Sequence, residues 1–118
     1  MRVRLPEPLK IVTTATDQIT VITVTGEIDR NSVGPLVQAL APRPLAGRPR
    51  VVVDMRRVSF MDSRGITILL AANRDLNRAG GWLRLAGVPH PILRILQLVG
   101  IDTVFDCRAS LRDALTAS

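Results

Sequence analysis

The sequence is poor in aromatic residues: its 118 residues include one Trp, two Phe and no Tyr. Proteins that bind single-stranded nucleic acids commonly stack bases on aromatic side chains, so this mode of binding is not expected. The core must instead be built from Val, Ile, Leu and Ala, within a hydrophobic content of 47%. A chain of this length and composition is typical of one compact domain with one core.

Cysteine and histidine are also scarce. The single Cys107 excludes an internal disulfide, which suits a reducing compartment. We interpret this residue as a small buried apolar group, with a redox-active thiol as the alternative. The sequence has no CxxC pair, no HExxH and no Walker-type loop. We therefore expect neither a bound metal nor a cofactor.

Long apolar runs are missing too. The longest nearly apolar stretch, "ITILLAA" at 66–72, is far too short to span a bilayer. The first ten residues contain no apolar segment of signal-peptide length. We expect a soluble protein of the cytoplasm that does not insert into a membrane.

The net charge of +6 raises the question of nucleic-acid binding, which depends on clustered Lys and Arg. All basic residues except Lys10 are Arg, and they are spread from Arg2 to Arg112 with no run longer than Arg56-Arg57. This spacing is typical of a dispersed charged surface. We expect no direct contact with nucleic acid, and an acidic protein partner would suit such a surface.

Strands are indicated by β-branched and apolar runs. "ITVITVT" at 19–25 alternates Val and Ile with Thr, which predicts a strand with one polar face that ends at Gly26. "VVVDM" at 51–55 is a short, largely continuous apolar run, typical of a central strand buried on both faces. Further strands are expected at 11–14, 82–87 and 103–106.

Helical patterns lie between these runs. Residues 32–41 predict a helix capped by Asn31 or Ser32, and a second helix begins after Ser63 and runs to Gly80. The remaining expected segments are helices in "PHPILRILQLVG" (89–100) and "SLRDALTAS" (110–118), and a surface connection at 41–50. Strands alternating with helices predict an α/β fold in which helices cover one sheet.

The stretch "FMDSRG" at 60–65 places Ser63 where an extended segment gives way to a helix. We predict that Ser63 is the N-cap, with its hydroxyl accepting a hydrogen bond from the N–H of Gly65 or Ile66. The same position suits a phosphate on that hydroxyl, because a helix N-terminus offers free N–H donors and a positive potential. Arg64 could pair with such a phosphate. From these residues alone, the cap and the phosphoacceptor both remain open.

This stretch also approaches a hydrolase motif. The nucleophile elbow requires G-x-S-x-G, and here Met61 stands in place of the first Gly. The only His, His90, lies between two prolines and would have to serve as the base. We expect no enzymatic activity.

Acidic residues follow or lie within two of the predicted strands. "TGEIDRNS" puts Glu27 and Asp29 just past a strand, where the loop is expected near the start of the Ser63 helix. Asp29 either caps the next helix, faces solvent or takes part in a site. Asp54 lies in a predicted buried strand, where a carboxylate needs backbone or Arg partners. We predict a structural hydrogen-bonding role for Asp54 at the end of its strand.

The stretches "TGEID", "VVVDMRRVSFMDSRG", "AGGWLRLAGV" and "LVGIDTVFD", in this order, resemble the STAS-domain family, and within it the bacterial anti-sigma-factor antagonists. The similarity runs from about residue 10 to 115, so we treat residues 1–118 as a single STAS-like domain. The resemblance implies an α/β fold: a small mixed β-sheet of four to five strands packed against about four helices. It also implies that the protein is a regulatory switch and not an enzyme, and that it needs no cofactor.

The family's function supplies further expectations. Such an antagonist binds an anti-sigma factor of the Ser/Thr kinase type and so frees a sigma factor for transcription. The kinase phosphorylates the Ser of the D-S motif, and the phosphoprotein dissociates. By match to that motif the phosphoacceptor is Ser63, with Asp62 beside it, and Asp29 falls on the acidic position of the "GE-x-D" piece. Arg64 and Thr67 depart from the family pattern, which often has a second hydroxyl and a small residue there.

On the predicted Ser63 helix, Ile66, Leu69, Leu70 and Asn73 form the stripe expected to face the core. The opposite face carries Arg64, Thr67, Ile68, Ala71 and Arg74. Ile68 and Ala71 are apolar although this face is expected to be exposed to solvent. They indicate either a docking surface or isolated apolar residues on the surface. We predict that the partner contacts Asp29, Asp62, Arg64, Thr67, Ile68 and Ala71.

A second function remains open. The chain would then be a non-phosphorylated STAS-type accessory subunit of a membrane lipid-transport complex, with Ser63 as a contact residue. The sequence leaves the oligomeric state open between a monomer and a weak dimer.

Overall fold

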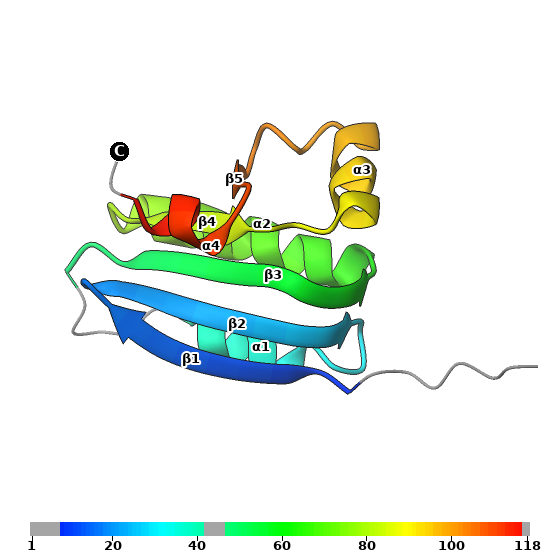
Figure 1. Cartoon of the computed structure of the whole chain (residues 1–118), viewed down its shortest axis with the longest axis horizontal. Helices are drawn as coiled ribbons and strands as arrows, with labels where there is room; N and C mark the ends of the chain where they lie inside the picture. Colours follow the sequence, from blue (N-terminus) through cyan, green and yellow to red (C-terminus); the bar gives the residue numbers. More distant parts are fainter. Residues whose placement is uncertain (1–7, 42–46, 117–118) are drawn as a thin grey trace, which may run out of the picture.

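The computed structural model describes residues 8–41 and 47–116. Its elements are β1 (Lys10–Thr16), β2 (Ile19–Ile28), α1 (Gly34–Leu40), β3 (Arg50–Met61), α2 (Ser63–Arg78), β4 (Trp82–Ala86), α3 (His90–Leu98), β5 (Asp106–Arg108) and α4 (Leu111–Leu115). The strands lie in the order β1-β2-β3-β4-β5, with β1 antiparallel to β2 and the other neighbours parallel (Figure 1). The predicted α/β fold with a mixed sheet is confirmed.

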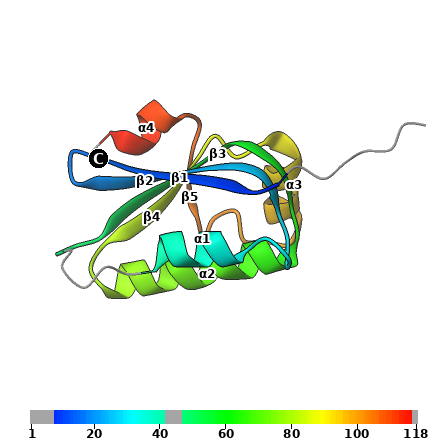
Figure 2. The same ribbon diagram turned by 90° about the horizontal axis from the view of Figure 1, so that it is seen from below.

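Helices cover both faces of the sheet. Figure 2 shows α1 and α2 on one face and α4 on the other, with α3 at the end of the molecule where α2 begins. The main core lies between the sheet and the helices α1, α2 and α3. A smaller cluster on the opposite face packs α4 against the sheet and contains Ile19, Val21, Val52, Ala86 and Ala114.

Strand β3 is the centre of the sheet. Residues 51–55 are all buried, as the continuous apolar run predicted. The strand continues to Met61, well past this run, while its pairing with β4 ends where Asp54 lies opposite Ala86. The last part of β3 therefore pairs only with β2 and carries the chain to the edge of the sheet where α2 begins.

Strand β2 does not end at Gly26, contrary to the prediction. Gly26 is buried with a φ of 102°, and the pairing with β3 shifts register between Gly26 and Glu27. Glycine tolerates this conformation, so the strand absorbs a bulge there and continues to Ile28. The expected single polar face is also wrong for the first half of β2, because Val21 packs under α4 while Ile22 enters the main core.

Other boundaries differ by a few residues. The expected strands at 11–14 and 82–87 are confirmed as β1 and β4. The strand expected at 103–106 is wrong in position: residues 102–104 form a turn, closed by a hydrogen bond from the N–H of Val104 to the carbonyl of Ile101, and β5 follows. In the predicted connection 41–50, residues 42–46 lie outside the described residues, and Arg50 already belongs to β3.

The predicted helices are confirmed, with corrected ends. Helix α1 begins at Gly34 after Val33, so neither Asn31 nor Ser32 is its N-cap. Helix α4 has Ser110 as its N-cap and ends at Leu115, before the last residues of the segment predicted to be helical; of that segment, 117–118 lie outside the described residues. No helix within the described residues is long and apolar enough to cross a membrane.

Candidate functional site at the start of α2

The loop after β2 and the end of β3 meet at one edge of the sheet, because the two strands are parallel neighbours. The backbone N–H of Asp62 donates a hydrogen bond to the carbonyl of Ile28 at 3.1 Å. The backbone N–H of Arg30 donates to Oδ2 of Asp62 at 3.3 Å. The predicted proximity of the "TGEIDRNS" loop to the Ser63 helix is therefore confirmed.

The N-cap of α2 is Asp62, and the prediction that Ser63 caps this helix is wrong. Asp62 has an extended backbone, and its Oδ1 accepts hydrogen bonds from the N–H of Arg64 at 2.9 Å and of Gly65 at 3.3 Å. An N-cap must precede the helix and fold its side chain back onto the first turn, and Asp62 meets both requirements. Ser63 is the first residue of the helix.

This arrangement leaves the hydroxyl of Ser63 unengaged. Ser63 is exposed, and its hydroxyl forms no hydrogen bond with another described residue. Its carbonyl accepts a hydrogen bond from the hydroxyl of Thr67 at 2.9 Å. The side chain of Ser63 therefore has no structural partner in the described part of the chain.

A polar hollow of about 530 Å³ surrounds this hydroxyl. It is lined by Arg30, Asp62, Ser63, Arg64 and Thr67. The sequence prediction included four of these residues but not Arg30. No signal in the sequence singles out Arg30, because it reaches the site from a loop that only the parallel pairing of β2 and β3 brings there.

Asp29 organises its own loop. Its Oδ1 accepts hydrogen bonds from the N–H of Asn31 at 2.9 Å and from the hydroxyl of Ser32 at 3.0 Å. The hydroxyl of Ser32 also reaches the carbonyl of Glu27 at 2.9 Å, which explains why Ser32 does not cap α1. Asp29 thus neither caps the next helix nor lies free in solvent, and it holds the loop in place beside Ser63.

A buried glycine lets α2 begin close to the sheet. A Cβ on Gly65 would lie 2.6 Å from Cγ of Met61 and 2.7 Å from Cγ2 of Ile28. These contacts are too short for any larger residue without displacement of its neighbours. Gly65 therefore sets how closely the Ser63 end of the helix approaches the strand ends.

The face of α2 that enters the core differs from the predicted stripe. The buried residues are Gly65, Leu69, Ala72 and Leu76, whereas Ile66, Leu70 and Asn73 are only half-buried. The predicted stripe is displaced to one side of the buried face. Gly65 and Ala72 are small and only weakly hydrophobic, so the sequence pattern does not mark them as core residues. On the predicted outer face Arg64, Thr67 and Arg74 are exposed, as expected.

Ile68 and Ala71 are half-buried, and the expectation that they face water is wrong. They lie on the side of α2 that faces α1, and Ile68 packs against the main core. Together with Val37 of α1 they line an apolar hollow of about 290 Å³ between the two helices. Val37 at its rim remains 46% exposed. Helix α2 therefore lines two hollows: the polar one at Ser63 and, from Ile68 onward, the apolar groove that it shares with α1.

Asp54 has the arginine and backbone partners that the sequence predicted. It is 2% exposed, and its Oδ1 and Oδ2 accept hydrogen bonds from Nε and Nη2 of Arg56 at 3.0 and 2.9 Å. The N–H of Arg56 adds a third bond to Oδ1 at 3.2 Å. Its predicted position at the end of a strand is wrong, because β3 continues to Met61. The pair is structural and lies within the sheet.

A buried arginine that the sequence analysis missed joins α4 to the sheet. Arg84 in β4 is 5% exposed, and its Nη1 donates hydrogen bonds to the carbonyls of Ala114 and Thr116 at 2.9 Å each. Its guanidinium also lies 3.9 Å from the ring centroid of Trp82. An alternating strand sequence gives no sign that one of its charged residues is buried.

Titratable groups of β5 influence one another. A hydrogen bond from Nε of Arg108 to Oδ1 of Asp106, 2.7 Å long, lowers the pKa of Asp106 below its ordinary value. Burial raises the pKa of the Cys107 thiol, and the charges of Asp106 and Asp102 raise it further. Cys107 is half-buried and free, which agrees with its interpretation as a small apolar group. Its thiol is held in the less reactive protonated form.

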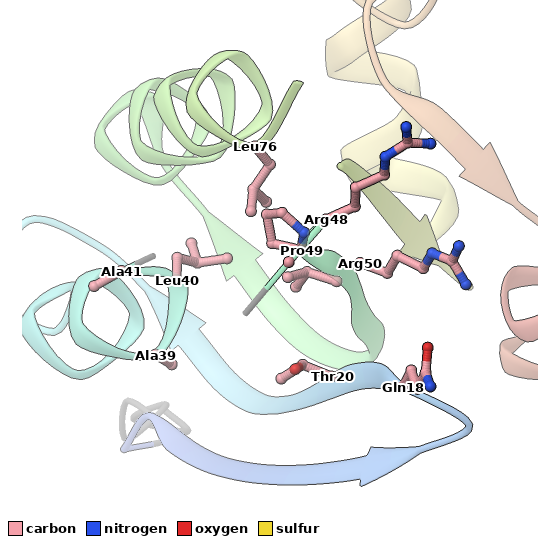
Figure 3. A pocket seen from close by; sticks show the side chains of 11 residues that line it. Gln18, Thr20, Ala39, Leu40, Ala41, Arg48, Pro49, Arg50 and Leu76 are labelled. Carbon is pink, nitrogen blue, oxygen red and sulfur yellow. The ribbon is translucent and has the colours of Figure 1, made fainter. Parts of the chain in front are cut away.

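A third hollow, of about 420 Å³, lies at the other end of α2 (Figure 3). In Figure 3 Leu40 and Leu76 converge from α1 and α2, whereas Arg48 and Arg50 extend toward the opposite side. Leu76 lies thirteen residues after Ser63 on one helix, about 20 Å along its axis. This hollow is therefore separate from the Ser63 site.

Neither a histidine base for Ser63 nor a metal site is found among the described residues. His90 is the exposed first residue of α3, and it forms no hydrogen bond with Ser63 in the described part of the chain. Within the described residues, no three or more His, Cys, Asp or Glu side chains lie together in a group that could hold a metal ion.

The protein is a small α/β domain of the STAS type, defined by its mixed sheet, by the helices on the main-core face and by the Asp62-Ser63 pair at the start of α2. A family model described as "Mlab, STAS domain" matches residues 11–113. The chain belongs to the STAS-domain family, and the resemblance seen in its sequence is confirmed.

Individual relatives agree with this family. An anti-sigma-B factor antagonist of Staphylococcus aureus is 31% identical over 93 residues, which cover 79% of this chain and 86% of that protein. The crystal structure of an anti-sigma factor antagonist from Mycobacterium paratuberculosis is 31% identical, with a TM-score of 0.74 over 94% of this chain and 96% of that one. The Bacillus cell fate determinant SpoIIAA in its phosphorylated form shares the fold, at 21% identity and a TM-score of 0.67, over 91% of this chain and 96% of that one.

Proposed function

We propose that this chain is an anti-sigma-factor antagonist of the cytoplasm that binds an anti-sigma factor and releases it when Ser63 is phosphorylated. The relatives at 31% identity that carry this name support the first part. One observation carries the second part: the hydroxyl of Ser63 is exposed and has no hydrogen-bond partner among the described residues. A kinase can reach such a hydroxyl without unfolding the chain.

The position of the cap explains how the modification can act on binding alone. Because Asp62 caps α2, a phosphate on Ser63 leaves the cap hydrogen bonds to Arg64 and Gly65 in place. The phosphate adds about two negative charges and three acceptor oxygens at the surface. A partner that packs closely around a neutral hydroxyl would have to desolvate this dianion, so its affinity falls while the domain stays folded.

The proposed docking surface has two parts. The polar part is the hollow that Asp62, Ser63, Arg64 and Thr67 line beside Arg30. The apolar part is the groove between α1 and α2 that Val37, Ile68 and Ala71 line. Apolar anchors beside a polar rim are typical of protein interfaces. Asp29 was also predicted to contact the partner. It supports this surface by holding the loop after β2 in place.

The partner is proposed to be of the Ser/Thr kinase type and to present an acidic surface. The net charge of +6 favours encounter with such a surface, and the attraction weakens as salt screens it. Affinity for the anti-sigma factor should therefore fall with rising ionic strength.

Incubation with the candidate kinase and ATP, followed by mass spectrometry, tests the switch directly. Phosphate is expected on Ser63, and the modified chain should lose at least tenfold in affinity for its partner. The variant Ser63→Ala should bind and resist release, and Ser63→Asp should bind more weakly. Ser59→Ala is the matched control, because Ser59 is an exposed serine four positions upstream. Phosphate on Ser59 or Thr67, or full affinity after complete modification of Ser63, would refute the switch.

The apolar groove is tested with Val37→Asp. Val37 is 46% exposed, so a charge there should leave the fold intact and weaken partner binding about tenfold or more. Val12→Asp is the matched control, because Val12 is also 46% exposed but lies on β1. Equal affinity of the two variants would place the docking surface elsewhere. Ile68 is unsuitable for this test because it packs against the core.

A second candidate function is a non-phosphorylated accessory subunit of a membrane lipid-transport complex. The description of the matching family model, "Mlab, STAS domain", favours it. Co-purification from native cytosol separates the two: a kinase-type anti-sigma factor supports the first proposal, and a transporter ATPase supports the second. In the second case, incubation of the parent chain with a kinase and ATP should leave its affinity for the partner unchanged, and Ser63→Ala should bind as the parent does.

We further propose that the domain is not an enzyme. Met61 stands where a nucleophile elbow needs Gly, and no described residue forms a hydrogen bond with the hydroxyl of Ser63. The purified domain should not hydrolyse p-nitrophenyl esters, and Ser63→Ala should leave any background rate unchanged. Turnover that disappears in Ser63→Ala would establish a hydrolase instead.

A further inference from the structure

Two arginines line the hollow around Ser63, and they come from different segments. Arg30 lies in the loop after β2, and Arg64 lies in the first turn of α2. Both are exposed, and neither side chain forms a hydrogen bond or ion pair with another described residue. Both guanidinium groups are thus available to an anion in the hollow.

The backbone at this helix start offers less to an anion than the sequence suggested. The N–H groups of Arg64 and Gly65 already donate to Oδ1 of Asp62, and the N–H of Arg30 donates to Oδ2. A phosphate on Ser63 would therefore find these donors occupied and would lie beside the negative charge of Asp62. The expectation that free N–H donors of the helix N-terminus hold the phosphate is wrong for the N–H groups of Arg64 and Gly65.

Side chains must then supply the positive charge. We propose that Arg30 and Arg64 hold the phosphate of phosphoserine 63 within the same chain, one guanidinium from the loop after β2 and one from the first turn of α2. This proposal rests on the proposed function, in which Ser63 is phosphorylated. The planar guanidinium fork matches the geometry of phosphate oxygens, and such charge-assisted hydrogen bonds are among the strongest in proteins. The hollow of about 530 Å³ has ample room for a phosphate group.

The consequence is a reversal of charge at the docking surface. Without phosphate, the hollow holds two arginines and Asp62, and its net charge is positive. A phosphate of about two negative charges makes that net charge negative. It also bridges the loop after β2 and the start of α2, which the hydrogen bond between Arg30 and Asp62 already joins. An acidic group of a partner that is attracted to the unmodified hollow is repelled from the modified one.

The test uses the full chain with phosphoserine incorporated at position 63 during translation, so that no kinase is needed. Phosphorus NMR follows the second ionisation of the phosphate as the pH is varied. In the folded chain its pKa should lie about half a unit to one unit below that of the same chain unfolded in urea, since nearby cations favour the dianion. Arg30→Gln and Arg64→Gln should each raise this pKa. The double variant should bring it to the unfolded value or above, because Asp62 remains.

Arg74→Gln is the matched control, because Arg74 is exposed on α2 but does not line the hollow. It should leave the titration unchanged, and urea unfolding should show that all four variants fold cooperatively. An identical pKa in the parent chain and in the double variant would refute the proposal.

The result also separates this proposal from the proposed function. If a kinase modifies Ser63 and the partner is released, but the double variant titrates as the parent does, only the arginine contact is refuted. If no kinase modifies Ser63 while the double variant still raises the pKa, the contact is supported and the kinase switch is refuted.

Discussion

Asp62 and Arg30 are 32 positions apart in the sequence and are joined by a hydrogen bond of 3.3 Å from the N–H of Arg30 to Oδ2 of Asp62. The other carboxylate oxygen of Asp62 caps α2. One side chain therefore sets both the start of the helix and the place of the neighbouring loop. The geometry around Ser63 depends on this residue more than on Ser63 itself.

Replacement of Asp62 should destabilise the domain. Asp62→Ala removes the cap of α2 and should lower the free energy of unfolding by about 1–2 kcal/mol in urea titrations. Asp62→Asn keeps an acceptor oxygen for the cap and should lose less. Asp75→Ala is the control, because Asp75 is exposed and its carboxylate is paired, among the described residues, with its neighbour Arg74 at 3.5 Å. An equal loss in Asp62→Ala and Asp75→Ala would show that the cap contributes nothing specific.

Gly65 and Gly34 should respond oppositely to the same substitution. Gly65→Ala places a Cβ 2.7 Å from Cγ2 of Ile28, and this overpacking should lower the free energy of unfolding by about 1–3 kcal/mol. Gly34→Ala meets no atom within 4 Å, so its effect should be near zero or stabilising by a few tenths of a kcal/mol. Thermal unfolding of both variants measures the contrast. A neutral Gly65→Ala would mean that Met61 and Ile28 move aside easily.

The turn between β1 and β2 should gain stability from a glycine. Asp17 and Gln18 both have positive φ, 49° and 66°, in a two-residue turn between antiparallel strands. This conformation favours Gly at the second position. Gln18→Gly should therefore raise the free energy of unfolding by about 0.5–1 kcal/mol. Gln18→Ala keeps the unfavourable backbone and should not stabilise, and a stabilising Ala would refute this explanation.

Low pH should reduce the contribution of Asp106 to the free energy of unfolding. Its pKa is lowered in the folded chain, chiefly by the hydrogen bond from Arg108, so the unfolded chain takes up its proton first as the pH falls. The stabilisation is present above the ordinary carboxyl pKa near 4 and is lost as the pH falls through the lowered value. The difference in unfolding free energy between the parent and Asp106→Asn should shrink across that window. Arg108→Gln should flatten the same pH dependence, and an unaltered curve in that variant would contradict the assignment.

Much of the fold was predictable from local sequence. The run 51–55 predicted a central buried strand, because a strand covered by helices on both faces of the sheet carries apolar residues on both sides. The helix after Ser63 was predictable from its period, and the family from four ordered stretches. The place of Ser63 between an extended segment and a helix also followed from the sequence. These features depend on residues that are close in sequence.

The details of the site required the tertiary structure. Asp62 and Ser63 are both good cap residues, and only the backbone geometry at the end of β3 decides that Asp62 takes this role. Ile68 is half-buried because α1 packs beside it, and sequence periodicity alone cannot say which neighbour covers a side of a helix. Arg30 lines the Ser63 hollow because β2 and β3 are parallel and end at the same edge of the sheet. Such contacts join segments about thirty residues apart, and no local pattern encodes them because their free energy is gained only when the sheet has formed.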